Sequence, residues 1–315
     1  MNFLFLMNSL ESIIYKKDTS FVLMLEAQSR GIKVFYLPND GITHKNGKLL
    51  FNVIEVEPQL KEDYPFIVKE SKSLSEDDVD ALFIRTDPPF DEKYLINTWL
   101  LSSLFNRVAI INNPSGIRTA NEKIWAAQFL NIVPNTLIGN NKNDILSFLS
   151  EEKEIIAKPT NGFGGQSVFK IDKDDTNAKV ILETLSNNFS RDIVCQEFVK
   201  DSVKGDKRIL LLDGEFLGAV LRVHAKDEHR NNFFSGGTPT VTELTEQDKK
   251  IIDILKPELK KLGLYFVGID IIGDYLIEVN VTSPTCVQEI NRLYNVKLEA
   301  KVIDFAVELV TKQTS

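Results

Sequence analysis

The sequence predicts an open α/β domain at the N-terminus, residues 1–120, followed by two α+β parts, residues 121–200 and 201–315. Three observations lead to this prediction. In the first part, short apolar runs alternate with helical segments, which is typical of a parallel sheet. In the second part, strands and a helix follow in mixed order. In the third part, tight turns join neighbouring strands into hairpins.

The first part contains four candidate strands and one helix with clear ends. The strands are the apolar runs NFLFLM, KVFYL, ALFIR and VAIINNP. Asp18 is placed to cap a helix that Gly31 ends. Within that helix, Phe21, Leu25 and Gln28 fall at helical spacing. The opening run NFLFLM is short and has neither a preceding Lys or Arg nor a cleavage pattern, which indicates a buried strand rather than a targeting segment.

The other two parts follow by the same reasoning. The segment ANEKIWAAQFL predicts a helix, and the strands EIIAKP, SVFKI and DIVCQEFV surround a second helix, TNAKVILETLSNN. The segment KRILLLDGEFLGAVLRVH predicts a hairpin that turns at Asp213 and Gly214, a favoured pair for a two-residue turn. A helix near 245–262, the hairpin YFVGIDIIGDYLIEVN and a last helix near 296–312 complete the chain.

Composition limits the functions that the chain can have. Of its 315 residues 43% are hydrophobic, and the net charge of −8 argues against a broad nucleic-acid or membrane surface. No run approaches the roughly 20 apolar residues of a membrane helix. The two cysteines, Cys195 and Cys286, are too few for a disulfide framework. We therefore expect a cytoplasmic protein that binds neither nucleic acid nor membrane.

A lysine and a glycine-rich loop occur together in IIAKPTNGFGGQSVFK. Lys158 ends a strand, and three glycines follow within four residues. Backbone amides of such a loop can approach a phosphate closely. The spacing fits neither the phosphate loop that ends in Gly-Lys-Ser/Thr nor a dinucleotide fingerprint, because SVFKI continues as a strand. A plain hairpin loop is an equally good interpretation of this motif alone.

Two arginines lie near the ends of the first hairpin. Asp206 and Arg208 begin one strand, and Arg222 lies on the next. Folding the hairpin can bring the two guanidinium groups together, which suits a phosphate or a carboxylate. The alternative is that each arginine lies at a solvent-exposed strand end, as lone arginines usually do.

Three oxygen-bearing side chains lie on the second hairpin. Glu278 and Asn280 are two residues apart in a strand and so share a face. A strict two-residue turn would pair Asp270 with Ile277 and turn Asp270 away from Glu278, whereas one bulge would bring all three onto one face. A buried Asp, Glu and Asn without a cation would need other partners, so we predict a divalent cation site here.

The order of these motifs resembles the ATP-grasp ligases and, among them, the bacterial glutathione synthetases. The segments KKDTSFVLMLEAQSRG, RTDPPFD, NEK, GDKR and FVGIDIIGDYLIEVNVTSPTC look like that family's segments, in its order. The resemblance implies an ATP-grasp fold behind the N-terminal α/β domain, with a central lid and a C-terminal part that grip ATP. It implies that γ-glutamylcysteine is joined to glycine through an acylphosphate, with release of ADP and phosphate.

The resemblance also implies roles for individual residues. The catalytic arginines are Arg208 and Arg222. The ligands of Mg²⁺, with two ions expected and Mn²⁺ as a substitute, are Asp270, Glu278 and Asn280. The contacts to ATP are Lys123, Lys158, Gly162, Gly164, Gly165, Gln166, Gln196, Glu197, Phe198, Val199 and Asp206. The contacts to the peptide and glycine are Arg85, Asp87, Arg230, Asn232, Ser283 and Thr285. The family further implies a homotetramer.

The chain departs from the family's pattern at a few loop positions. Asn8 follows the first strand where Asp-Pro is usual, Glu197 replaces a more neutral hinge residue, and Asn231 stands where glycine is expected.

Two alternative functions remain. One is another carboxylate–amine ligase with a different amine or peptide, and the other is a nucleotide-binding sensor without turnover. The intact Lys158 and Arg208 argue against the sensor. An NAD-dependent oxidoreductase would need a glycine fingerprint after the first strand, which is absent.

Overall fold

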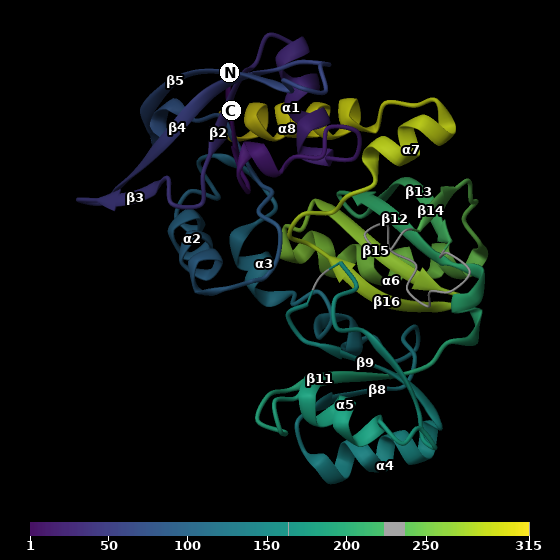
Figure 1. The fold of residues 1–315 in the computed structure, drawn as a ribbon. Coiled ribbons are helices and arrows are strands. Elements are labelled where there is room, and N and C mark those ends of the chain that lie inside the picture. The colour runs from purple at the N-terminus through teal and green to yellow at the C-terminus, as the bar shows by residue number, and fades with distance from the viewer. Residues whose placement is uncertain (163, 224–236, 315) are drawn as a thin grey trace.

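The computed structural model describes residues 1–162, 164–223 and 237–314, and these residues form three sheets in chain order (Figure 1). A seven-stranded sheet is followed by a four-stranded and a five-stranded sheet. The expected order of an α/β part and two α+β parts is therefore confirmed. Among the described residues, no helix has both the length and the apolar character needed to cross a bilayer.

The first sheet is mixed rather than purely parallel. Its parallel core has the predicted strands, in the order β2-β1-β6-β7: Lys33–Leu37, Asn2–Leu6, Ala81–Ile84 and Ala109–Ile111. An antiparallel meander that the sequence analysis missed extends this core beyond β2: β3 (Ile42–Lys45), β4 (Lys48–Pro58) and β5 (Phe66–Ser75). The prediction of only parallel strands was wrong, because short loops rather than helices join β3, β4 and β5, and these strands pair antiparallel.

Helices from both ends of the chain pack against the parallel core. The helix α1 (Thr19–Ser29) begins as predicted, with Asp18 Oδ1 accepting a hydrogen bond from Phe21 N at 2.7 Å. Its buried face carries Phe21, Met24 and Ala27 rather than the expected Leu25 and Gln28. The last helix, α8 (Leu298–Thr314), lies beside α1 and contributes to the core around β1 (Figure 1). The remaining helices of this part are α2 (Glu92–Ser102) and α3 (Pro114–Thr119).

The second sheet is antiparallel, with the strand order β10-β9-β11-β8. Its strands are Phe169–Asp172, Glu154–Pro159, Ile193–Glu197 and Thr136–Gly139. Two helices pack on it, α4 (Lys142–Glu152) and α5 (Ala178–Leu185). The predicted strands β9, β10 and β11 and the helix α5 are confirmed, whereas β8 and α4 were missed.

The segment ANEKIWAAQFL does not form the predicted α-helix. It contains only a short 3₁₀ helix, Trp125–Gln128. Glu122 of this segment, and Ile132 just beyond it, bond instead to the edge strand of the third sheet: Val279 N donates to Glu122 O at 2.9 Å, and Leu276 N donates to Ile132 O at 2.7 Å. Tertiary hydrogen bonds thus replace the helical ladder in this segment. The other 3₁₀ helices are Leu10–Ser12, Glu76–Asp78 and Lys200–Lys204.

The third sheet has the strand order β14-β13-β12-β15-β16. Its strands are Thr238–Thr240, Glu215–Val223, Asp206–Leu212, Phe266–Ile272 and Tyr275–Asn280. Both predicted hairpins are present, and Asp213 and Gly214 have the positive φ angles of 50° and 74° that a tight hairpin turn requires. The helices of this part are α6 (Glu246–Leu262) and α7 (Val287–Tyr294), of which α7 was missed.

One buried side chain joins the first sheet to the third. Asn112 Nδ2 donates to Phe266 O and to Val281 O, both at 2.8 Å. Phe266 N donates back to Asn112 Oδ1 at 2.7 Å. A fully bonded buried amide fixes its partners in register. The end of β7 therefore holds β15 and the segment that follows β16.

Candidate active site

A cavity of about 630 Å³ lies where the three parts of the chain meet. Every described residue that the sequence analysis assigned to a site lines this cavity, whether it was assigned to ATP, metal, catalysis or substrate. The exceptions are Arg230 and Asn232, which lie outside the described residues. The fold thus collects side chains that are up to 200 residues apart into one concave site, as a ligand-binding pocket requires.

A bulge in the hairpin of β15 and β16 brings the three expected metal ligands onto one face. Asp270 stands opposite Glu278, and Gly268 stands opposite Asn280. The register shifts directly after Asp270, so Ile277 is the extra residue of the bulge. This is the geometry that the metal prediction needed, in place of a strict two-residue turn.

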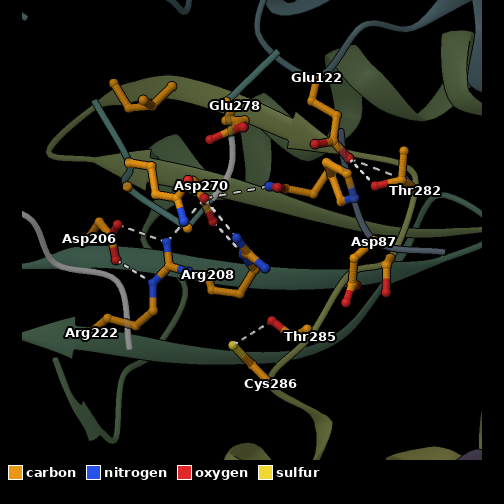
Figure 2. A pocket seen from close by; sticks show the side chains of 18 of the residues that line it. Asp87, Glu122, Asp206, Arg208, Arg222, Asp270, Glu278, Thr282, Thr285 and Cys286 are labelled. Carbon is orange, nitrogen blue, oxygen red and sulfur yellow. Dashed lines mark hydrogen bonds and ion pairs between the residues drawn. The ribbon is translucent and has the colours of Figure 1, made fainter. Parts of the chain in front are cut away.

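Asp270 lies at the centre of a buried network with two arginines, drawn in Figure 2. Both Arg208 Nε and Arg208 Nη2 donate to its carboxylate, the latter at 2.8 Å. Arg222 Nη2 lies 3.0 Å from Asp270 Oδ2 and also binds Asp206 at 2.7 Å. Although burial opposes it, the two guanidinium groups hold the pKa of Asp270 well below its usual value. The two guanidinium groups therefore converge, as predicted from the hairpin that carries them.

Glu278 is paired with a lysine that comes from the connection between the first and second parts. Lys123 Nζ lies 3.0 Å from Glu278 Oε1 and also donates to the carbonyl oxygen of Gly162 in the glycine-rich loop. Against the effect of burial, Lys123 lowers the pKa of Glu278, and Glu278 raises the pKa of Lys123. Asp270 and Glu278 thus each have a cation of the protein as a partner.

These ion pairs remove the physical argument that was used to predict a metal ion. Burial of Asp270 and Glu278 no longer demands a divalent cation, because Arg208, Arg222 and Lys123 already balance their charge. Among the described residues, no three His, Cys, Asp or Glu side chains are grouped closely enough to hold a metal by themselves. Two carboxylates and the Asn280 amide still fit Mg²⁺, which commonly binds one or two protein carboxylates and completes its shell with phosphates and water.

Lys158 is a second lysine in the cavity and has a different environment from Lys123. It lies on β9, is 4% exposed, and precedes the glycine-rich loop. Burial lowers the pKa of Lys158 to about 8, and the charge of Lys123 adds to this effect while Glu278 opposes it. An ammonium group so destabilised is well suited to receive an anionic ligand.

The cavity wall formed by the N-terminal part is centred on Arg85. Its Nε donates to Ser20 Oγ at 3.0 Å, and its Nη2 donates to Pro284 O at 2.9 Å. Pro284 lies between the predicted substrate residues Ser283 and Thr285, so Arg85 fixes that turn. Asn8, one of the departures from the family pattern, accepts a hydrogen bond from Asp87 N at 2.9 Å.

Glu122 is a cavity residue that the sequence analysis did not assign. Its Oε1 accepts a hydrogen bond from Val281 N at 3.0 Å. The same oxygen accepts from Thr282 N at 3.1 Å and from Thr282 Oγ1 at 2.8 Å; Glu122 and Thr282 face each other in Figure 2. Burial and the nearby Glu278 raise the pKa of Glu122. The only signal in the sequence is its place beside Lys123 in the NEK segment.

Known proteins resemble this chain over nearly its whole length. The N-terminal domain of prokaryotic glutathione synthetase matches residues 1–118, and the ATP-grasp domain of prokaryotic glutathione synthetase matches residues 122–295. The glutathione synthetase of Vibrio parahaemolyticus is 41% identical over 95% of both chains, and that of Vibrio cholerae is 40% identical over 98% of both chains.

Solved structures share the fold at much lower identity. The D-cycloserine synthetase DcsG superimposes with a TM-score of 0.67 at 14% identity, covering 99% of both chains. A peptide-associated ATP-grasp ligase of Chryseobacterium gregarium reaches 0.64 at 16% identity, covering 99% of this chain and 97% of its own. The two α+β parts therefore form an ATP-grasp fold, and the chain, an ATP-dependent ligase, belongs to the family of the prokaryotic glutathione synthetases.

Proposed function

We propose that this chain joins γ-glutamylcysteine to glycine at the expense of ATP, through an acylphosphate. The observation that best supports this reaction is that four of the cationic side chains lining the cavity come from the second and third parts of the chain: Lys123, Lys158, Arg208 and Arg222. A carboxylate resists attack by an amine because its leaving group would be an oxide ion, whereas a phosphorylated carboxylate has a good leaving group. Transfer of a phosphoryl group needs several fixed positive charges around it.

In this proposal the two arginines stabilise the group in transfer. Arg208 and Arg222 are buried; Asp270 holds Arg208 in place, and Asp206 and Asp270 hold Arg222. A guanidinium group that is already fixed in place can donate to phosphate or carboxylate oxygens without having to reorganise. They orient the cysteinyl carboxylate of the dipeptide toward the γ-phosphate, and they stabilise the negative charge that shifts between the two.

Lys123, Lys158 and the glycine-rich loop hold the phosphates of ATP in this proposal. The loop residues are Gly162, Gly164, Gly165 and Gln166, and the adenine and ribose lie against Gln196, Glu197, Phe198, Val199 and Asp206. Asp270, Glu278 and Asn280 would hold Mg²⁺, with two ions proposed and Mn²⁺ as a substitute. The metal would neutralise phosphate charge. A solved structural neighbour with a TM-score of 0.61, the ligase PsnB, is described as complexed with Mg and ADP.

The substrate side is proposed to use Arg85, Asp87, Ser283 and Thr285 for the dipeptide, with Arg230 and Asn232 near glycine. We further propose three functional parts with the boundaries 1–120, 121–200 and 201–315, a homotetramer, and a cytoplasmic location. The buried, unpaired state of Cys195 and Cys286 is consistent with a reducing compartment.

One assay tests the reaction. ADP release is measured with ATP, magnesium and γ-glutamylcysteine, with and without glycine, and the product mass is determined. We expect glycine-dependent ADP release and a product with the mass of glutathione. ADP release only with another amine would keep the ligase chemistry and replace the substrate. ATP binding with no turnover for any amine would refute the proposal and favour a nucleotide sensor.

A further inference from the structure

The segment 281–285 lies between β16 and α7 and forms part of the cavity wall. Three of its residues line the cavity: Thr282, Ser283 and Thr285. It directly follows Asn280, a proposed ligand of Mg²⁺, and it carries Ser283 and Thr285, which are proposed to contact the dipeptide. In the proposed reaction, the position of this segment therefore sets where the dipeptide lies relative to the phosphates of ATP.

Glu122 holds the start of this segment through one carboxylate oxygen. Its Oε1 atom accepts hydrogen bonds from Val281 N, from Thr282 N and from Thr282 Oγ1. The backbone oxygen of Glu122 also accepts a hydrogen bond, from Val279 N at 2.9 Å. Thr282 is 5% exposed, so removal of the carboxylate would leave buried N–H and O–H donors without an acceptor. Glu122 thus fixes the segment at the point where it leaves β16.

Two other side chains hold the segment independently of Glu122. Asn112 Nδ2 donates to Val281 O at 2.8 Å, and Arg85 Nη2 donates to Pro284 O at 2.9 Å. Both of these bonds go to carbonyl oxygens, whereas Glu122 accepts from N–H and O–H groups. Loss of the Glu122 acceptor should therefore shift the segment without unfolding it.

Glu122 belongs to a short piece of chain that also contacts the glycine-rich loop and the residues before it. Lys123 Nζ donates to Gly162 O. Asn121 Nδ2 donates to Thr160 O at 3.4 Å, and Asn121 Oδ1 accepts from Lys123 N at 3.1 Å. Because consecutive Cα atoms are only about 3.8 Å apart, residues 121–123 keep the loop and the 281–285 segment in a fixed relation to each other.

We propose that Glu122 is a positioning residue for the ligation: its Oε1 atom holds the 281–285 segment, and the dipeptide that contacts it, in line with the phosphates of ATP. This inference rests on the proposed function. Glu122 acts here as a hydrogen-bond acceptor and takes no part in proton transfer. A displacement of about 1 Å between reacting groups can cost about 100-fold in rate, so a small shift of this segment has a large effect on catalysis.

The test compares a variant that keeps the acceptor with one that removes it. Glu122→Gln keeps a side-chain oxygen that can accept hydrogen bonds, whereas Glu122→Met has a similar length and no such oxygen. The matched control is Glu76→Met. Glu76 is buried, accepts a hydrogen bond from Leu49 N at 3.0 Å and is not among the residues that line the cavity. Urea unfolding measures the stability of every variant.

We expect Glu122→Met to lower kcat/KM for γ-glutamylcysteine by roughly 10- to 100-fold. Glu122→Gln should stay within about threefold of the wild type, because its oxygen accepts the same hydrogen bonds. KM for ATP should stay near the wild-type value in both variants, since Lys123 is unchanged. Glu76→Met should lower the free energy of unfolding without changing the kinetics of the folded enzyme.

Three results would overturn the role of Glu122. The first is wild-type kcat/KM in Glu122→Met. The second is an equal loss in Glu122→Gln and Glu122→Met, which would show that the charge or a proton transfer matters and not the acceptor. The third is a rise in KM for ATP as large as the rise in KM for γ-glutamylcysteine, which would show that the whole site is disturbed.

Thr282 keeps the inference testable if Glu122→Met fails to fold. Thr282→Val removes the hydroxyl group that donates to Glu122, and Thr282→Ser keeps it. We expect kcat/KM for γ-glutamylcysteine to fall by about 3- to 10-fold in Thr282→Val and to recover in Thr282→Ser. In a folded Glu122→Met background, Thr282→Val should have no further effect. Wild-type kcat/KM in Thr282→Val, or losses that multiply in the double variant, would overturn the inference.

Failure of the proposed function itself looks different from failure of this inference. The wild type would then release no ADP with γ-glutamylcysteine and glycine, whatever residue stands at position 122.

Discussion

If Lys158 binds a phosphate of ATP as proposed, ATP binding should depend on pH near the pKa of this lysine. Burial lowers its pKa from the ordinary value of 10.5 to about 8, which corresponds to about 3 kcal/mol against the ammonium form at 1.36 kcal/mol per pKa unit. Phosphate oxygens favour the ammonium form, so ATP should raise this pKa again. The charge of Lys158 is present below pH 8 in the free protein and is lost as the pH rises through that value.

The expected size of the effect follows from the charged fraction. Lys158 is about three-quarters charged at pH 7.5 and about one-tenth charged at pH 9 if its pKa is about 8, so ATP affinity should fall by up to about eightfold. At pH 8, each ATP bound should take up about half a proton. Phosphate groups, with a second pKa near 6, contribute little to this change. Calorimetric titration in two buffers of different ionisation enthalpy measures both quantities.

Two variants distinguish the effect of Lys158 on the pH dependence from that of Lys123. Lys158→Arg keeps a charge that does not titrate in this range, so the pH dependence and the proton uptake should disappear. Lys123→Met should weaken ATP binding and shift the pH dependence to higher pH without abolishing it, because the charge of Lys123 lowers the pKa of Lys158. A wild-type affinity that does not change from pH 7.5 to 9, or a dependence that persists in Lys158→Arg, would refute the reasoning.

Three further predictions concern the charged network. Glu278→Gln should lower kcat severely while circular dichroism stays unchanged; near-normal turnover would exclude Glu278 as an essential ligand. Arg208→Lys should lower kcat/KM by about tenfold or more in steady-state assays, since one ammonium cannot bind both oxygens of Asp270 as the guanidinium does; equal rates would contradict its role. Asp270→Asn should lower the free energy of unfolding by about 3–5 kcal/mol in urea, because Arg208 and Arg222 would remain buried without their shared carboxylate; a loss below about 1 kcal/mol would disagree.

Local sequence patterns predicted the elements whose partners are also local. The two hairpins of the third sheet turn within a few residues of their own strands, and the capping residue of α1, Asp18, lies three residues from its donor, Phe21 N. The segment around Trp125 was mispredicted because its backbone partners, Leu276 and Val279, lie about 150 residues further along the chain. No helical periodicity can reveal such a partner.

In the site, too, the features that depend on nearby residues were predicted, and those that depend on distant residues were not. Alternation along β16 correctly placed Glu278 and Asn280 on one face, and the need for a bulge could be stated before the structure was known. The partner of Glu278 could not be stated, because Lys123 is 155 residues away. For the same reason, Asp18 could be recognised from the sequence as a helix cap, and not as part of a cavity wall with Arg85.

The pairing of Lys123 with Glu278 has a consequence for the order in which ligands bind. In the free protein each of these groups satisfies the other at 3.0 Å. A ligand cation that attracts Glu278 releases an ammonium group, and a ligand anion that attracts Lys123 releases a carboxylate. Each ligand thus prepares the subsite of the other. Cation and nucleotide should therefore bind with positive coupling, and each should raise the affinity of the other by the same factor.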